Sequence, residues 1–110
     1  MEIKYNEKCC IIVPLSSNLS SYKLEKIFDR IEKEERRVAL DLSNFQDCNI
    51  EFIQRLMDIK RKDLGIFNIP SDIFVLFNMM NLDKFAKLFV SQMDFENDLR
   101  QIINRKFSII

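Results

Sequence analysis

The sequence contains no histidine and no tryptophan, and only one glycine, among its 110 residues. Without histidine, Ser-His and Cys-His nucleophilic catalysis is excluded, and so are the usual zinc sites. A single glycine leaves no glycine-rich loop that could bind phosphate. No pair of Asp, Glu or Lys side chains stands at a spacing typical of acid–base catalysis. These absences predict a protein that is not an enzyme and that uses no cofactor and no metal.

Charge of one sign is also lacking, since 17 Lys and Arg residues balance 17 Asp and Glu residues. Nucleic-acid-binding domains usually carry an excess of positive charge, so no nucleic acid is expected as a partner. No apolar run approaches the roughly 20 residues of a membrane span, and the N-terminal sequence MEIKYNEK is too charged for a signal peptide. We therefore expect no direct membrane insertion and a cytoplasmic location.

Cysteine occurs in an odd number, as Cys9, Cys10 and Cys48. This does not fit a disulfide framework and is typical of a reducing compartment. Cys9 and Cys10 are neighbours in a predicted strand, so their side chains point to opposite faces and do not form a redox pair. We expect all three thiols to be reduced, metal-free and used for packing.

The length and composition that are present predict one globular domain, residues 1–110. Hydrophobic residues make up 47% of the chain and charged residues 31%, and ten Phe supply core material. Strand patterns alternate with helix patterns, which predicts an α/β fold with a mixed sheet of four or five strands and about four helices packed largely on one face. The expected elements, in chain order, are two strands with a turn near Asn6 and Glu7, a helix over 21–35, a strand over 37–42, a helix from 50 that closes over 58–63, a strand over 65–69, a helix over 72–80, a strand over 85–91 and a helix over 94–106.

Several positions carry more specific expectations. The strand over 37–42 alternates apolar residues and is expected in the interior of the sheet. Asn49 can cap the second helix, and Gly65 follows a basic helix end, where a left-handed residue is most easily placed. The helix over 72–80 is apolar nearly all round and is expected to be buried against the sheet. The last helix is expected to carry Phe95, Leu99, Ile102 and Lys106 at helical spacing.

Three motifs, in order, resemble those of the STAS domain, the family named for sulphate transporters and anti-sigma-factor antagonists. LDLS at 40–43 ends a hydrophobic strand, Pro70 precedes a helix, and LDKF at 82–85 stands with LF at 88–89 before the last elements. Element order and length agree with the family over nearly the whole chain. The resemblance implies a STAS-like single domain that works as a regulatory, non-enzymatic protein–protein interaction module. Its implied partner is a protein, such as an anti-sigma kinase-like or other regulatory protein.

The chain departs from the family at its switch residue. In the family's antagonists, a serine at the first turn of the helix after LDLS accepts phosphate, because the helix N-terminus favours negative charge. Counted without gaps, Ile50 falls at that position, and with a two-residue deletion Cys48 does. Neither register leaves a serine, so no phosphorylation is expected there. A milder departure is Asn81 at a family glycine, since Asn tolerates the left-handed conformation.

The resemblance places partner binding in the turn and helix start made of Asp47, Cys48, Asn49, Ile50 and Glu51. In the ungapped register, Glu51 lies in the first turn of the second helix, where a carboxylate interacts favourably with the helix dipole. It either imitates a phosphoserine with a permanent charge or serves ordinary helix-start chemistry.

The sequence also allows two alternatives to this interaction module. The Phe-rich sheet surface and the helix over 72–80 could line a pocket for a small molecule or a lipid, although core packing accounts for the same Phe and Met residues. Because STAS partners include membrane transport complexes, the resemblance also allows an accessory subunit of such a complex.

Overall fold

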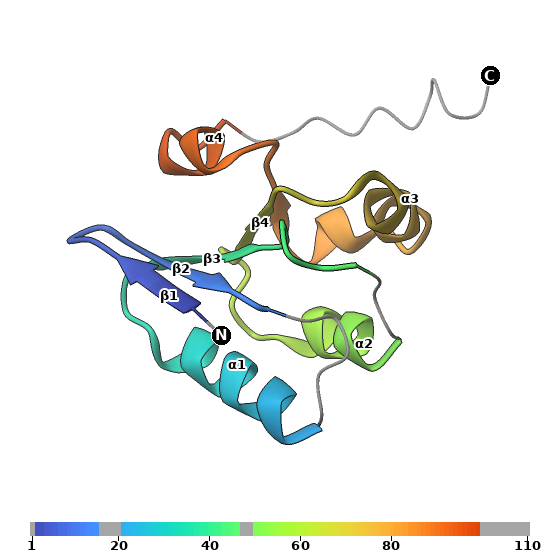
Figure 1. Cartoon of the computed structure of the whole chain (residues 1–110), viewed down its shortest axis with the longest axis horizontal. Helices are drawn as coiled ribbons and strands as arrows, with labels where there is room; N and C mark the ends of the chain where they lie inside the picture. Colours follow the sequence, from blue (N-terminus) through green and yellow to red (C-terminus); the bar gives the residue numbers. More distant parts are fainter. Residues whose placement is uncertain (1, 16–20, 47–49, 100–110) are drawn as a thin grey trace.

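Five strands form one mixed sheet at the centre of the protein (Figure 1), whose computed structural model describes residues 2–15, 21–46 and 50–99. The sheet is mixed because the first strand runs antiparallel to the second, whereas the other neighbours pair parallel. The predicted α/β fold is therefore confirmed, and the third strand lies in the interior of the sheet as expected. The strands lie side by side in chain order as β1 (Glu2–Tyr5), β2 (Cys9–Val13), β3 (Arg37–Asp41), β4 (Gly65–Phe67) and β5 (Lys87–Leu88).

Helices cover the two faces of the sheet unequally. The buried side chains of α1 (Ser21–Lys33), α2 (Ile50–Asp58) and α3 (Ser71–Met79) join one large hydrophobic cluster with one face of the strands. The short helix α4 (Gln92–Glu96) contributes Phe95 to a smaller cluster on the other face, and Figure 1 shows α4 across the sheet from α1 and α2. The prediction that the helices lie largely on one face is thus confirmed.

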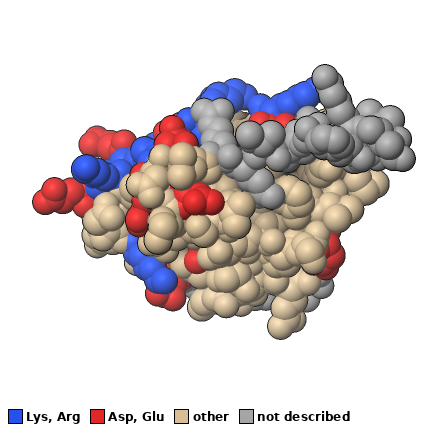
Figure 2. All heavy atoms as spheres, turned by 90° about the horizontal axis from the view of Figure 1, so that it is seen from above, with Lys and Arg blue, Asp and Glu red and all other residues tan. Residues whose placement is uncertain are grey.

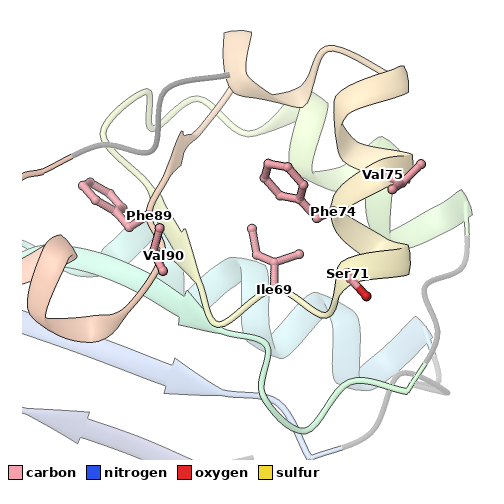
Figure 3. Close-up of a pocket in the computed structure, with 6 residues that line it drawn as sticks. All are labelled: Ile69, Ser71, Phe74, Val75, Phe89 and Val90. Atoms are coloured by element: carbon pink, nitrogen blue, oxygen red, sulfur yellow. The ribbon is translucent and has the colours of Figure 1, made fainter. Parts of the chain in front are cut away.

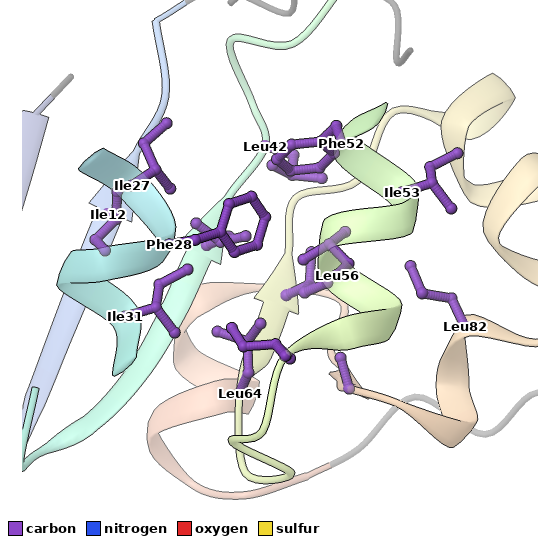
Figure 4. Packing of buried hydrophobic residues seen from close by; sticks show 14 of the residues in the cluster. Ile12, Ile27, Phe28, Ile31, Leu42, Phe52, Ile53, Leu56, Leu64 and Leu82 are labelled. Atoms are coloured by element: carbon purple, nitrogen blue, oxygen red, sulfur yellow. The ribbon is translucent and has the colours of Figure 1, made fainter. Parts of the chain in front are cut away.

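The larger cluster forms because α1 and α2 present apolar side chains at helical spacing toward the strands. Figure 4 shows Phe28 of α1 and Phe52 of α2 pointing toward one another, and their ring centroids are 5.8 Å apart. Phe45, which follows β3, also packs against Phe52, with 5.0 Å between their ring centroids. Fully burying a side chain of this size stabilises the fold by about 1.5–3 kcal/mol, so these contacts hold both helices on the sheet.

Hydrogen bonds from Arg61 connect loops at the edge where β2 to β5 begin, here called the amino edge. Its guanidinium donates to the carbonyl oxygens of Ile31 at 3.0 Å, Glu34, and Arg36 at 2.7 Å. These carbonyls lie at and after the end of α1, where a helix leaves acceptors without internal partners. A bidentate pair with Asp63 fixes the guanidinium and lowers the pKa of that carboxyl. Hydrogen bonds within the chain therefore hold the loops of the amino edge together.

A buried carboxylate adds to this edge. Glu34 is 7% exposed, and its two carboxylate oxygens pair with Arg36 Nε at 2.7 Å and with Arg30 Nη2 at 3.1 Å. The hydrogen bond from Arg36 is the main cause that lowers the pKa of Glu34. Arg36 also donates to the Asn6 carbonyl at 3.1 Å, so the predicted turn at Asn6 is tied to the end of α1.

The expectation for Gly65 was wrong. Gly65 is the first residue of β4 and does not have a positive φ. A Cβ at this position would stand 2.6 Å from Phe95 Cδ1 and 3.1 Å from Phe89 Cε2. The glycine is thus required by the close approach of an aromatic ring to the strand. A left-handed residue does occur at Asn81, where φ is 55°, a conformation that Asn tolerates.

Several predicted elements are shorter in the structure. α2 ends at Asp58, and the strands predicted over 65–69 and 85–91 contain only the residues of β4 and β5. α3 is not buried all round, because Val75 is 57% and Met79 75% exposed.

The last predicted helix was too long. α4 ends at Glu96 and is followed by Asp98 with a positive φ of 55°, so Leu99 lies outside it. Ile102 and Lys106 lie outside the described residues.

Candidate interaction surface

The predicted partner site lies at the edge where β2 to β5 end, here called the carboxyl edge. In a parallel sheet each strand leads into a loop and then a helix start at this edge, and ligand sites of open α/β sheets occur there. Here it gathers Leu15, residues 42–46, the start of α2, residues 68–70 and Val90. At the opposite edge, the hydrogen bonds of Arg61 tie the loops to one another.

Asp41 organises this edge from within. It is 6% exposed, and its Oδ1 accepts hydrogen bonds from Ser43 N at 3.0 Å and from Asn68 Nδ2 at 3.2 Å. Asn68 follows β4 and has a positive φ of 53°. Because burying an unpaired carboxylate is costly, these two donors are what allow Asp41 to lie there. The acidic residue of the LDLS motif therefore joins the loop after β3 to the loop after β4.

The structure places two of the five predicted site residues at the start of α2. Ile50 is the first residue of that helix and is 59% exposed, although an isoleucine is usually buried. Glu51 is exposed in the first turn, as expected. Asp47, Cys48 and Asn49 lie outside the described residues, and so does the cap expected from Asn49.

Other large apolar side chains are exposed at the same edge. Leu15 follows β2 and is 57% exposed, and Val90 follows β5 and is 59% exposed. Val75 lies in the second turn of α3, the helix that begins directly after the loop from β4. Figure 2 views the molecule from above and shows a broad area with few charged side chains toward α3, whereas Lys, Arg, Asp and Glu gather toward the β1–β2 turn. Exposed apolar residues rimmed by polar ones are typical of protein interaction sites.

A hollow of about 350 Å³ lies between α3 and the chain that follows β5. In Figure 3, Phe74 and Ile69 point toward the space between these two segments. Among the described residues, the hollow is lined by one polar side chain, Ser71, and by Ile69, Phe74, Val75, Phe89 and Val90.

The sequence anticipated only part of this hollow. It indicated a pocket wall from the helix over 72–80, and Phe74 and Val75 of α3 do line the hollow. It gave no signal for Asn68, whose positive φ turns the chain between β4 and α3, or for the place of Val90 beside α3. The available clue to these two residues was that the strands predicted over 65–69 and 85–91 both end at this edge.

No protein-family model and no curated protein matches this sequence.

The remaining chemistry of the described residues points to packing. Cys9 and Cys10 are free and buried, and burial raises the pKa of the Cys10 thiol, which keeps it neutral and poorly reactive. Among residues 2–15, 21–46 and 50–99, no cluster of three or more His, Cys, Asp or Glu could hold a metal ion. Within the same residues, every helix is too short or too polar to cross a bilayer.

Proposed function

We propose that this protein is a non-enzymatic interaction module, similar in role to the anti-sigma-factor antagonists of the STAS family, and that it docks a protein partner at the carboxyl edge. The main observation in its favour is the exposed Ile50 beside the acidic Glu51 at the start of α2. The resemblance of the LDLS motif and the element order support the comparison with the family.

In this proposal Ile50 and Glu51 have different roles. Ile50 is an apolar anchor, because covering its exposed side chain removes apolar surface from water. Glu51 places a negative charge at a helix N-terminus, where the helix dipole stabilises it. A partner with a basic patch would bind that charge at the helix start, next to the position that holds a phosphoserine in the family.

Partner binding is constitutive under this proposal, because Ile50 cannot accept phosphate and no serine or threonine lies in residues 46–52. Incubation with ATP and an anti-sigma-type kinase should leave residues 46–52 unmodified. Phosphate mapped to this segment by mass spectrometry would contradict the lost switch.

The test of docking compares two variants that replace exposed apolar residues. Ile50→Asp changes the proposed surface. Met79→Asp serves as the matched control, because Met79 is also exposed but lies at the end of α3 that is farther from the carboxyl edge. Each tagged chain is crosslinked in its source cell and its bound proteins are quantified. A partner lost with Ile50→Asp and retained with Met79→Asp supports the proposal. Equal loss with both variants, or retention with both, contradicts it.

Glu51→Lys separates the two interpretations of Glu51. A charge change at an exposed site usually alters stability by no more than about 0.5 kcal/mol. If partner affinity falls by more than this while the free energy of unfolding is unchanged, Glu51 acts as a phosphate-like charge. If partner affinity and the free energy of unfolding fall together, Glu51 only stabilises the start of the helix. If partner affinity is unchanged, Glu51 does not contact the partner.

The hollow beside α3 favours a second candidate, a domain that binds a small molecule or a lipid, alone or as an accessory subunit of a membrane transport complex. Its apolar lining suits such a ligand, and its volume of about 350 Å³ lies at the small end of the usual range of about 300–1,000 Å³. Native mass spectrometry of the purified protein tests this candidate. A retained ligand mass that is lost with Phe74→Asp would support it.

A further inference from the structure

We propose that β1 is a docking strand for a second copy of this chain, and that two copies pair their β1 strands antiparallel across a two-fold axis at Ile3. Their two sheets would then join into one continuous sheet. This inference goes beyond the proposed function, because it concerns contacts between copies of the chain and holds whether or not Ile50 binds a partner.

β1 is an edge strand, since β2 is its one neighbour in the sheet among the described residues. Figure 1 shows β1 on the far side of the sheet from β4 and α3. Three of its four side chains are exposed, namely Glu2, Lys4 and Tyr5, and Ile3 is half-buried. The free side of an edge strand presents backbone N–H and C=O groups that can pair with a further strand.

The β1–β2 hairpin determines which backbone groups of β1 are available. The Asn6 amide donates to the Cys9 carbonyl at 3.0 Å, and hydrogen-bonded pairs recur at every second residue of an antiparallel ladder. In the observed register this places the bonds to β2 at Lys4 and Glu2. The N–H and C=O groups of Ile3 between them therefore point away from β2, toward the free side.

The charges of β1 favour one register for a pair of such strands. Glu2 and Lys4 lie on the same face of the strand, with Lys4 Nζ 3.9 Å from Glu2 Oε1. When Ile3 faces Ile3 of the second copy, Glu2 of each copy faces Lys4 of the other. Opposite charges that face each other across two strands are favourable. The same register lets the free groups of both Ile3 residues bond to one another.

Neighbouring registers lack this match. A shift by two residues in one direction places Glu2 opposite Glu2 of the second copy, and a shift in the other direction places Lys4 opposite Lys4. Like charges directly opposite each other are destabilising. A shift by one residue places the free groups of Ile3 opposite groups that already bond to β2. The register centred on Ile3 thus satisfies both the backbone and the charges.

The resulting pair is symmetric and closed, as most soluble homodimers are. The two Ile3 side chains meet on the face that carries α1, where Ile3 already packs against the larger hydrophobic cluster. Because the strands are antiparallel, the carboxyl edges of the two copies point in opposite directions. Each copy can therefore bind a partner at its own carboxyl edge, and the pair is a bivalent module.

Sedimentation velocity of the full chain tests whether the pair forms. Two paired strands of four residues make a small interface, and small interfaces are usually weak. The measurement therefore covers a concentration series up to about 1 mM, the range in which weak complexes associate. The weight-average sedimentation coefficient should rise from the monomer value toward that of a dimer and no further.

Charge variants of β1 test the register. Glu2→Lys gives each strand two positive charges and Lys4→Glu gives it two negative ones, so each variant should lower the association constant about tenfold. The double variant Glu2→Lys with Lys4→Glu again places opposite charges across the axis and should associate like the wild-type chain. Both side chains are 54% exposed, so the fold should tolerate these changes, and thermal unfolding of each variant checks this.

A second double variant, Lys4→Glu with Asp72→Lys, is the matched control. Asp72 is exposed in the first turn of α3, away from β1. This variant has the same net charge as the wild-type chain and as the first double variant, but it keeps two negative charges on β1. It should associate as weakly as Lys4→Glu alone.

Crosslinking with a carbodiimide tests the geometry, because this reagent joins a carboxylate to an amine only where the two groups are in contact. The reaction is carried out in an equal mixture of unlabelled and isotope-labelled chains, so that a mixed product identifies a bond between two copies. The proposed register predicts a mixed product that joins Glu2 of one copy to Lys4 of the other.

Three results would overturn the proposal. The first is a wild-type chain that stays monomeric throughout the concentration series. The second is equal association of the two double variants, because net charge and not the pairing of β1 would then control association. The third is a dimer in which the mixed crosslinks join other residues. None of these results bears on partner binding at Ile50, which is measured separately.

Discussion

The contact between Gly65 and Phe95 predicts that Gly65→Ala destabilises this protein. A new Cβ would stand 2.6 and 2.7 Å from two ring carbons of Phe95 and 3.1 Å from Phe89. Ordinary contacts with a Cβ begin near 3.4 Å, so the Phe95 ring or β4 has to move by most of an ångström. The substitution therefore tests whether α4 is held rigidly on its face of the sheet.

The surroundings of Phe95 leave little room for that movement. Its ring is fully buried, 5.4 Å from the Phe89 ring and 5.8 Å from the Phe67 ring, measured between centroids. The Arg37 guanidinium lies 4.4 Å from the ring centroid and also donates to the Phe95 carbonyl at 2.9 Å. Moving the ring would disturb all of these contacts.

The expected cost follows from two opposing effects. Overpacking a core costs about 1–3 kcal/mol, whereas replacing a strand glycine by alanine otherwise gains about 0.5–1 kcal/mol. We expect a net loss of about 1–2 kcal/mol in the free energy of unfolding, which lowers Tm by roughly 5–15 °C for a domain of this size. Urea unfolding followed by circular dichroism measures the loss, and the slope against urea should be unchanged.

The double variant Gly65→Ala with Phe95→Leu provides the control. Removing part of the ring gives the new methyl group space, so the combined loss should be smaller than the sum of the single losses by about 1 kcal/mol, within the usual range for residues in contact. A neutral or stabilising Gly65→Ala would refute the reasoning. Additivity of the two substitutions within about 0.5 kcal/mol would refute it as well.

Three further predictions concern charge and backbone conformation. Since Arg36 lowers the pKa of Glu34, the stability that this carboxylate contributes is present above its unfolded-state pKa near 4.3 and is lost as pH falls through the folded value. Glu34→Gln should therefore cost about 1–3 kcal/mol at pH 7 and flatten the acid limb of a stability–pH curve; an unchanged limb would contradict this. Arg61→Lys should cost about 1–3 kcal/mol in urea unfolding, because one ammonium cannot reach the same set of carbonyls, and a fully stable Lys variant would disprove the clamp. Asn81→Ala should lower stability by about 1 kcal/mol while Asn81→Gly leaves it unchanged or higher, and equal effects of both would exclude a conformational cause.

The sequence predicted those features that depend on local periodicity. The interior position of β3 follows from its alternating apolar residues, and α1 is found close to its expected bounds because its apolar side chains recur at helical spacing. The left-handed conformation of Asn81 agrees with what the family resemblance implied, because Asn tolerates that conformation. Such features need no knowledge of contacts between distant parts of the chain.

The features that were missed depend on those distant contacts. Gly65 was assigned to a helix end because only its neighbours in sequence were considered, whereas the ring that requires it is 30 positions away. The last helix was overextended because Phe95 and Leu99 have helical spacing, although Asp98 breaks the helix between them. The hollow needs the relative position of α3 and Val90, which no local pattern contains.

The adjacent cysteines give this protein two internal reporters of unfolding. Cys9 belongs to the cluster under α4, whereas Cys10 belongs to the cluster under α1 to α3, with its Sγ 4.0 Å from Arg30 Nη2 of α1. One peptide unit thus carries a thiol into each helical layer. A buried thiol reacts with an alkylating reagent only after its own cover has opened, so the rates of modification at the two positions report separately on the two layers. Equal rates would mean that both layers leave the sheet in one cooperative step, and unequal rates would identify the layer that leaves first.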